Sequence, residues 1–566
     1  MSVSNFFHKI YHLASHACIL LVCVSSYAWA QTGGEVQSET IVIEKEKKLE
    51  LPPANREFEK IQDPQPQVAP TNSKYQTQDI GIVLPQFDTK VKVPTTKTDD
   101  PVEIHNHYVK AGFGNYATPY LEAFFHTGKQ KNYAAGARLK HLSSANGPYK
   151  GVKNSLNEID LQGKYWFDKQ WVQASLGAGR ERYTWYGVSN RDNIDDWDND
   201  SLKILFTKIN AAISTGNMGT GKWKYNTGLN LGYQSGNHNN KESNIDGLLN
   251  INYQKESDVT IGMDVLIGNS TYTDSSSTFS RMLVGLTPKY TMTRDKWKAT
   301  VGLNYTYSGD TLDGSKGSHL YPIIEGSYTL VPNKWVAEAG FKGGMEKNTW
   351  SSLTAQNPYL GTGISLAHTN NKINLYARIK GNLGNNINVK AGAAYLLYQN
   401  LSYMTNSRTD SSRFEMLYSN DNTSAFNLNG EVTYDAYPFR TGLKLDYYSY
   451  STPGNDTIIR KPWHRPSFVG SFFAAYTIHK KIVLKTDIYY ISGLSGLNLE
   501  RYATTGVYEE KKLDAIFDLN LKAEYRFSNE FSAFIEANNL LSQKYQRYLY
   551  YQSRGINLLF GVTYRF

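Results

Sequence analysis

The C-terminal residues 554–566 show a regular alternation of apolar and polar side chains. One face carries Ile556, Leu558, Phe560, Val562, Tyr564 and Phe566, and the other carries Asn557, Gly561, Thr563 and Arg565, with Leu559 as the exception. A period of two residues predicts a β-strand. Because this strand ends on an aromatic residue without a polar tail, we expect a closed barrel in a membrane, whose last strand pairs with its first.

A second strand is predicted at residues 514–527. Apolar side chains on one face alternate with Asp514, Asp518, Asn520, Lys522, Glu524 and Arg526 on the other. Ionised side chains on one strand face are costly in a packed core, whereas they are typical of a strand that lines a water-filled lumen. The charged face therefore favours a transmembrane barrel over a soluble sandwich.

Similar strands follow one another from residue 105 onward, joined alternately by short turns and long loops. Short turns are predicted at 168–170, 217–222, 294–296, 332–334, 384–385, 436–438 and 528–530, and longer polar stretches at 143–155, 188–201, 346–371, 404–412, 451–464 and 543–553. We assign the short turns to the periplasm and the long loops to the cell exterior. The count is about 22 strands, with a range of about 14–24 because a pair such as 414–435 could be one bulged strand. The predicted fold is an all-β, antiparallel outer-membrane β-barrel with both termini periplasmic.

The composition agrees with this class. Aromatic residues make up 13% of the chain, with 42 Tyr, and such barrels need aromatic girdles at both membrane interfaces. The mean hydropathy of −0.50 would suit a soluble protein, but polar lumen faces and loops dilute any average. No apolar run after the N-terminal segment is long enough for a spanning helix.

Residues 1–30 are interpreted as a cleaved signal peptide. Lys9 precedes an apolar run at 17–24, and Ala28-Trp29-Ala30 provides a small-x-small cleavage site. Export to the outer membrane of a Gram-negative bacterium is therefore expected. Cys18 and Cys23 both lie in this segment, so the mature chain has no disulfide. Cys23 as a lipoprotein acceptor is the alternative, but the residue before it, Val22, is not small.

Residues 31–104 differ from the rest of the chain. They contain eight of the 18 prolines, few aromatic residues and no strand-and-turn series. The segment is predicted to be an extended periplasmic arm, which could enter the lumen. The remaining residues, 105–566, form the predicted barrel.

The closing hairpin resembles that of TonB-dependent receptors. Residues 534–545 read Phe-Ile-Glu-Ala-Asn-Asn-Leu-Leu-Ser-Gln-Lys-Tyr, and the last strand ends on Tyr564-Arg565-Phe566. The residues that match the family's barrel-closing pattern are Asn538, Asn539, Leu540, Lys544, Tyr545, Tyr564 and Phe566. Residues 108–116 and 357–377 are similar to a shorter, receptor-like barrel group that is common in Bacteroidota outer membranes. The resemblance implies passage of a solute across the outer membrane.

The resemblance extends to one segment of the arm. Glu39, Thr40, Ile41, Val42, Ile43 and Glu44 resemble the energy-coupling box of these receptors, which adds as a strand to TonB in the periplasm. The alternative is a solvated, β-prone tail. Receptors of this family also carry a globular plug about twice as long as residues 31–104, which are too few and too polar to bury a core. Energy-coupled uptake therefore stays open, and the arm, the loop at 346–371 with a short helix at 351–357, or a partner protein must fill the lumen.

Two groups of residues could bind a metal. His105 and His107 alternate on one strand face, but with no third ligand in view a place at the membrane interface is favoured. Residues 189–201 form an oxygen-rich loop that could bind Ca²⁺ through Asp192, Asp195, Asp196, Asp198 and Asp200. Their spacing does not reproduce an EF-hand, and a solvated or lipid-facing loop is the alternative. No cofactor is otherwise indicated.

The remaining chemistry argues against an enzyme and against nucleic-acid binding. The sequence has no Gly-rich phosphate loop, paired-cysteine site or nucleophile elbow. The net charge is +9, or +8 without residues 1–30, but the basic residues are spread along strands and turns. Such a distribution suits anionic solutes or the phosphates of outer-membrane lipid. A solute-transport barrel is the main hypothesis, and a non-transporting barrel that serves as a platform for a lipoprotein or other partner is the alternative.

Overall fold

The wall of the protein is a single antiparallel sheet closed into a barrel. The computed structural model describes residues 106–566 except 129, 189–199, 220, 385, 454–457 and 508. The expected signal peptide, the arm with Glu39–Glu44, His105 and the side chains of the Asp192–Asp200 loop lie outside the described residues. The sheet has 22 strands, so the predicted strand count and fold class are confirmed.

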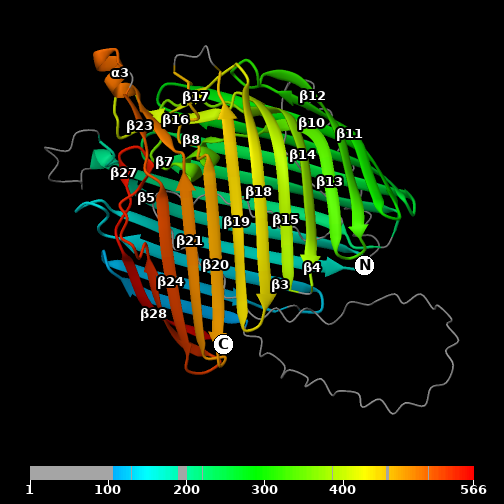
Figure 1. Ribbon diagram of the computed structural model, residues 1–566, viewed down its shortest axis with the longest axis horizontal. Helices are drawn as coiled ribbons and strands as arrows, with labels where there is room; N and C mark the ends of the chain where they lie inside the picture. Colours follow the sequence, from blue (N-terminus) through cyan, green and yellow to red (C-terminus); the bar gives the residue numbers. More distant parts are fainter. Residues whose placement is uncertain are drawn as a thin grey trace, which may run out of the picture.

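The first half of the wall comprises β1 (His107–Gly114), β2 (Thr118–His126), β3 (Tyr133–Ser144), β4 (Asn154–Phe167), β5 (Gln170–Thr184), β6 (Lys203–Asn217), β7 (Trp223–Gly236), β8 (Lys241–Glu256), β9 (Val259–Thr273), β10 (Thr278–Arg294) and β11 (Trp297–Ser308). The second half comprises β12 (Gly317–Val331), β13 (Trp335–Glu346), β14 (Thr369–Leu383), β15 (Ile387–Gln399), β18 (Thr423–Ala436), β19 (Phe439–Ser451), β20 (Phe468–Ile478), β21 (Ile482–Ser492), β24 (Ile516–Arg526), β25 (Phe531–Asn538) and β28 (Asn557–Arg565). Each strand pairs with the next one along the wall, as the ribbon shows (Figure 1).

The barrel closes where β1 pairs with β28. The backbone N–H of His107 donates to the Phe566 carbonyl at 2.9 Å, and the Phe566 N–H donates back at 3.1 Å. Gly112 and Gly561 lie opposite each other in this register, and a Cβ at Gly561 would lie 2.2 Å from the Ala111 carbonyl oxygen. The ring of Phe534 lies over this glycine pair, so only glycine fits the close approach. The predicted pairing of the last strand with the first is confirmed.

The two faces of the wall differ as the alternation predicts. On β28, Phe560 and Tyr564 are about half exposed and face outward, whereas Thr563 and Arg565 are buried on the inner side. On β24, the outward Phe517, Leu521 and Tyr525 alternate with the inward residues 518–524 of even number. Large apolar side chains at the same outward positions recur around the wall. An apolar outer surface of this extent requires lipid around the barrel.

The turns and loops separate to the two ends of the barrel. The predicted short turns lie at the end that carries His107 and Phe566, although residues 220 and 385 of two of these turns are outside the described residues. The described parts of the long loops lie at the opposite end, which we place outside the cell. Residues 414–435 are not one bulged strand: β17 (Phe414–Tyr418) belongs to a separate small sheet, whereas β18 belongs to the wall. The insertion at 493–515 was not predicted.

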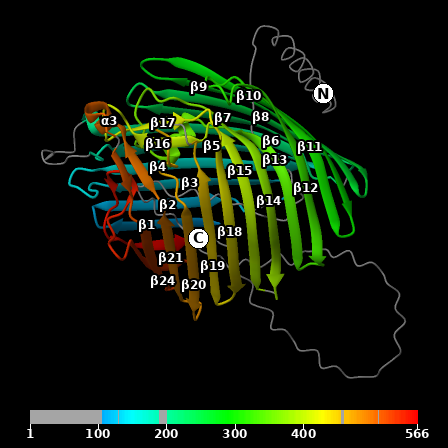
Figure 2. The ribbon, with the colours of Figure 1, turned by 45° about the horizontal axis from the view of Figure 1, so that its top comes forward.

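The long loops carry their own secondary structure. One small sheet has the order β17, β16 (Ser402–Asn406), β22 (Ser495–Asn498) and β23 (Glu509–Lys512), and another joins β26 (Gln546–Tyr548) to β27 (Tyr551–Gln552). The helices are α2 (Trp350–Gln356), α3 (Leu499–Thr505) and the short 3-10 helix η1 (Asp200–Leu202). In the described part of the chain, no helix has the length and apolar character needed to cross a membrane. Figures 1 and 2 show α3, β16 and β17 gathered at the upper mouth of the barrel.

Adjacent residues on β18 provide a direct test of the two faces. Leu428 faces outward and is 45% exposed, whereas Asn429 lines the interior. We expect Leu428→Arg to destabilise the inserted, folded barrel by roughly 2–4 kcal/mol, since the charge meets hydrocarbon near mid-membrane. Asn429→Arg should be tolerated, because its side chain enters a polar lumen. Urea unfolding in liposomes measures both variants, and equal losses would contradict the assignment of the faces.

Candidate functional site

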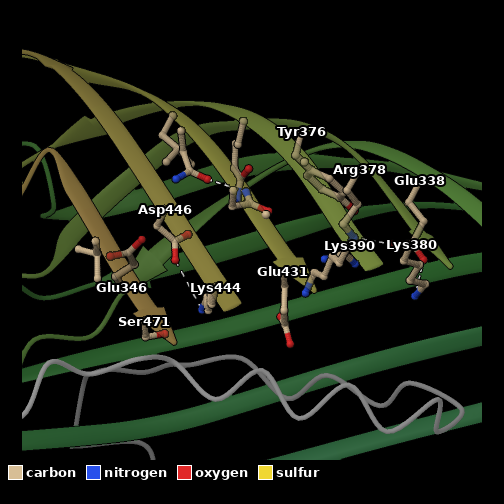
Figure 3. Close-up of a pocket in the computed structure, with 18 of the residues that line it drawn as sticks. Glu338, Glu346, Tyr376, Arg378, Lys380, Lys390, Glu431, Lys444, Asp446 and Ser471 are labelled. Carbon is tan, nitrogen blue, oxygen red and sulfur yellow. Dashed lines mark hydrogen bonds and ion pairs between the residues drawn. The ribbon is translucent and has the colours of Figure 1, made fainter. Parts of the chain in front are cut away.

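The barrel encloses a polar cavity of about 2600 Å³. It extends from residues at the periplasmic end, such as Asn333 and Arg440, to the loops that cover the outer end. Its roof is lined by Gln356, Ser402, Met404, Trp463, His464, Arg465, Arg547 and Tyr548. Charged side chains of neighbouring strands point into this space, as Figure 3 shows for Glu338, Lys390, Glu431 and Lys444. The lumen therefore offers a hydrated path that ends beneath a cover of loops.

Ion pairs bring together most of the charged groups along the inner wall. Lys289 pairs with Asp264 at 2.6 Å, Lys380 with Glu338 at 2.8 Å and Arg565 with Glu524 at 2.8 Å. Lys110 on β1 pairs with Glu536 on β25 at 2.6 Å, so one ion pair lies close to the closing seam. Cross-strand pairs of this kind balance charge along the wall without filling the lumen.

The cover at the outer mouth, here called the cap, is formed by five loops that pack on one another. They are the β3–β4, β5–β6, β13–β14, β15–β18 and β25–β28 loops, and their shared apolar cluster includes Val152, Trp185, Tyr186, Trp350, Leu353, Tyr359, Leu360, Met404, Phe414, Tyr548 and Tyr551. These loops leave the wall at widely separated strands. They can meet only by crossing the mouth, so the cap covers the outer end of the lumen.

Tyrosines connect the loops of the cap to one another. The rings of Tyr359 and Tyr551 stack with centroids 3.6 Å apart. The Tyr186 hydroxyl donates to the Gln552 carbonyl at 2.9 Å, and the Tyr548 hydroxyl donates to the Gln356 carbonyl at 2.6 Å. Burial raises the pKa of Tyr186 to about 12. These hydroxyls therefore stay protonated and keep donating at any physiological pH.

The β13–β14 loop places α2 inside the mouth. Thr349 caps the helix by accepting a hydrogen bond from the Ser352 N–H at 3.0 Å. The buried carboxylate of Glu242 on β8 accepts the N–H groups of Trp350 and Ser351 at 2.8 and 2.9 Å. Trp350 then packs edge-on against Phe206 of β6. The helix predicted at 351–357 is confirmed within one residue, and the predicted loop at 346–371 contributes to closing the barrel.

A buried polar network holds the two ends of this loop together. Arg281 on β10 donates to the Asn348 carbonyl at 2.8 Å and to His368 Nδ1 at 3.3 Å. The Asn348 N–H also donates to His368 Nδ1 at 3.2 Å. Burial lowers the pKa of His368 well below its ordinary range. The neutral imidazole therefore accepts both hydrogen bonds and ties the loop to the wall.

His464 joins its own β19–β20 loop to two loops of the cap. Its Nδ1 lies 2.7 Å from the Met404 carbonyl, so this nitrogen carries the proton and donates. Its Nε2 accepts the Leu549 N–H at 3.1 Å. The imidazole must be neutral to make both bonds. Burial lowers the pKa of His464 from 6.5 to about 4, so the junction is intact at neutral pH.

The predicted closing residues lie at the rim and seam of the barrel. Asn539 is fully buried, and its amide donates to the Gln543 and Arg554 carbonyls at 2.9 and 2.7 Å. The Tyr545 hydroxyl donates to Asp518 at 2.8 Å. Leu540 extends the backbone pairing through Leu519. Asn538 pairs with Asn557, Lys544 is exposed, and Tyr564 and Phe566 stack on the outer surface.

The structure describes only part of the two predicted metal-binding groups. His107 lies against Phe566, with ring centroids 5.0 Å apart, at the periplasmic end of the barrel. His105 and the side chains of the acidic loop are outside the described residues, so their expected roles stay predictions. Within the described ranges, no three His, Cys, Asp or Glu side chains lie close enough to hold a metal ion.

Sequence reasoning missed the residues that hold the cap together. These residues belong to no motif. They come from three distant parts of the chain and are Glu242, the neighbours His464 and Arg465, and Arg547. A weak signal was present in the repeated tyrosines at 548–551, next to the matched closing hairpin. Their burial at the centre of the mouth depends on tertiary structure alone.

The protein is a closed antiparallel β-barrel of 22 strands, and its fold is similar to that of the outer-membrane receptors called TonB-dependent receptors. The resemblance drawn from the closing hairpin is thereby confirmed at the level of fold. No protein-family model and no curated protein matches the chain.

Several solved structures share the fold. The FrpB iron transporter from Neisseria meningitidis matches with a TM-score of 0.61 and 10% identity, covering 82% of each chain. The ferripyoverdine receptor of the outer membrane of Pseudomonas aeruginosa matches with a TM-score of 0.61 and 11% identity, over 82% of this chain and 72% of its own. The ferric-catecholate import receptor Fiu from K12 E. coli matches with a TM-score of 0.61 and 10% identity, covering 82% of each chain. At such identities the likeness concerns the fold alone.

The His464 junction predicts how the cap responds to pH. The folded-state pKa lies below the ordinary value, so the neutral ring stabilises the closed cap above pH 6.5 and this contribution is lost as pH falls from 6.5 towards 4. We expect the hydrogen-exchange protection factor of the Leu549 amide, corrected for intrinsic rates, to fall over that window. His464→Gln should flatten the dependence, because an amide can donate and accept without titrating. His479→Gln, in an exposed periplasmic turn, is the control, and an unchanged profile in His464→Gln would contradict the assignment.

Proposed function

We propose that the protein is a receptor-like barrel that mediates passage of a solute across the outer membrane, with the cap as its gate. The observation that carries this proposal is the polar cavity that extends through the barrel and ends under a separately packed cover. A general porin would keep its lumen open to the outside. The closed mouth instead supports passage that follows opening of the cap.

The distribution of contacts suggests which part moves. The wall is held by a continuous backbone ladder, whose opening would expose unpaired N–H and C=O groups to lipid. The cap is held by aromatic packing and by side-chain hydrogen bonds such as those of Tyr186, Tyr548 and His464. Those groups can exchange their partners for water at the outer surface, so the cap is the lower-cost element to open.

Energy coupling belongs to the same proposal. Glu39–Glu44 would add as a strand to TonB or to another periplasmic or lipoprotein partner. The sequence pattern of this segment and the fold of the barrel support this role. The fold neighbours include an iron transporter and a ferric-catecholate import receptor, so import is the direction that we propose. A soluble small molecule, rather than a protein, fits the capped lumen.

The platform hypothesis is the second candidate, because one insertion outside the cap projects beyond the mouth (Figure 1). The β21–β24 insertion carries α3, on which Tyr502 is 37% exposed, and Val507 beyond it is 63% exposed. Exposed apolar side chains on a projecting helix and its flank are suited to contact a partner at the cell surface. In this alternative the cap stays closed and the barrel anchors a complex.

Single-channel recording of the full-length protein in a planar bilayer tests the gate. We expect low conductance in the wild type and a several-fold increase in Tyr551→Ala, because loss of a buried aromatic ring removes about 3–5 kcal/mol of packing from the cap. Tyr564→Ala, an equal truncation on the lipid-facing surface, should leave conductance unchanged. Equal conductance in all three proteins would contradict gating by the cap.

Deletion of residues 35–100 separates the arm from the cap. If the arm also obstructs the lumen, this deletion and Tyr551→Ala should raise conductance more together than singly. Growth on a limiting nutrient, with and without the energy-coupling machinery, then distinguishes active from passive uptake. Growth that depends on neither the protein nor the machinery would favour the platform hypothesis.

A further inference from the structure

Two arginines in the roof of the cavity carry charges that the protein does not pair. Four other arginines that line the same cavity each have a carboxylate partner: Arg138 with Asp160 at 3.0 Å, Arg378 with Glu338, Arg440 with Asp435 at 3.3 Å, and Arg565 with Glu524 at 2.8 Å. Among the described residues, no carboxylate lies within ion-pair distance of Arg465 or Arg547. Among the described arginines that line the cavity, the two without a carboxylate partner are those in the roof.

Both side chains are held in place by neutral acceptors. Arg465, in the β19–β20 loop, donates from Nε and Nη2 to the Ser402 carbonyl at 3.1 and 2.7 Å and from Nη2 to the Ser402 hydroxyl at 3.1 Å. Arg547, in the β25–β28 loop, donates from Nη1 to the His464 carbonyl at 2.9 Å. A guanidinium group has five N–H donors, so each arginine keeps donors that these bonds do not use. Arg465 also forms a hydrogen bond with the Tyr450 side chain, and both guanidinium groups keep N–H donors for a further acceptor.

The two cations also lie within electrostatic reach of each other. Burial lowers the pKa of Arg547, and the neighbouring charge of Arg465 lowers it further. Like charges in a partly desolvated site destabilise the folded protein unless an anion offsets them. Glu346 lines the same cavity and accepts a hydrogen bond from Asn371 at 3.2 Å.

Aromatic side chains surround the pair. The guanidinium carbon of Arg465 lies 5.8 Å from the ring centre of Tyr403, and that of Arg547 lies 5.1 Å from the ring centre of Tyr548. Tyr448, Tyr450 and Trp463 line the adjacent part of the cavity. Ring faces and hydroxyls beside two guanidinium forks suit a small organic anion more than a bare inorganic one, because the carbon skeleton gains contact area.

We propose that Arg465 and Arg547 form a binding site, facing the lumen from beneath the cap, for a small organic anion that carries carboxylate or phosphate groups. The guanidinium forks would bind these groups bidentately, as Arg does with planar anions. The proposal rests on the proposed function, because the solute must reach the lumen. The proposed site gives the chemical class of that solute and a position at which the solute binds during passage.

The site places recognition on the element that moves. Arg547 belongs to the β25–β28 loop of the cap, and Arg465 belongs to the β19–β20 loop beside it. Arg465 is attached to the β15–β18 loop of the cap through Ser402, and Arg547 is attached to the β19–β20 loop through His464. Opening of the cap would separate the two forks and release the anion. Binding would conversely hold the loops together, so the closed cap and the loaded site stabilise each other.

Isothermal titration calorimetry on the full-length protein in detergent tests the site, with citrate, inorganic phosphate and the neutral sugar maltotriose as probes. We expect saturable citrate binding that weakens as salt rises, and no heat from maltotriose. Arg465→Gln and Arg547→Gln should each reduce citrate affinity roughly tenfold or more, since each removes a charged hydrogen-bond donor. Arg440→Gln is the matched control, because it removes an ion-paired arginine from the periplasmic end of the same cavity and should change affinity less than about twofold.

The outcomes separate this proposal from the transport proposal. Phosphate that competes with citrate at similar affinity would assign a phosphate-bearing solute, whereas citrate binding alone would assign a carboxylate. Equal losses in Arg440→Gln and Arg547→Gln would overturn the site in favour of diffuse attraction by the lumen. No citrate binding to either the wild type or the opened Tyr551→Ala variant would also overturn it, even if bilayer recordings show a gated lumen. Heat-modifiable migration on gels verifies that each variant is folded, and Arg547→Lys should retain part of the affinity.

Discussion

The whole structure depends on one constraint, which is that no backbone N–H or C=O group can remain unpaired in the hydrocarbon region. The pairing of β1 with β28 satisfies it, and it requires the close approach of Gly112 and Gly561 beneath Phe534. A sheet of 22 strands closed in this way encloses a wide lumen, because barrel diameter grows with strand number. Because the lumen is wide, its outer mouth stays open unless loops cover it.

The cap is stabilised by the same kinds of interaction as the interior of a soluble protein. Loops from distant strands bury an aromatic cluster, and the hydroxyls of Tyr186 and Tyr548 donate to the backbone of other loops. Buried histidines also connect segments that are far apart in sequence, because the neutral imidazoles of His464 and His368 form hydrogen bonds with other loops or loop ends. A lid held by side chains can open while the wall, held by its backbone ladder, stays intact.

Electrostatics divide the interior into two regions. Along the wall, carboxylates and basic groups balance one another, as Lys289 does with Asp264, so the path carries little net attraction at these points. In the roof, Arg465 and Arg547 have no such partners among the described residues. The two arginines without a carboxylate partner agree with the proposed binding of an anion beneath the cap. The fold neighbours are iron and siderophore receptors, but the likeness at about 10% identity is one of fold, and the roof residues are the better guide to the solute.

The sequence by itself determined the class of the protein and the course of its wall. The alternation in 514–527 and 554–566, the spacing of short turns and long loops, and the closing hairpin around Asn539 were sufficient for the strand count, the faces and the pairing of the last strand with the first. These features are local or periodic, so they can be read along the chain. The insertion at 493–515, the separation of β17 from β18 and the junctions at His464, Arg465 and Arg547 were decided only by the tertiary structure. They arise where irregular loops from distant strands meet across the mouth, and no periodic pattern records which loop will meet which.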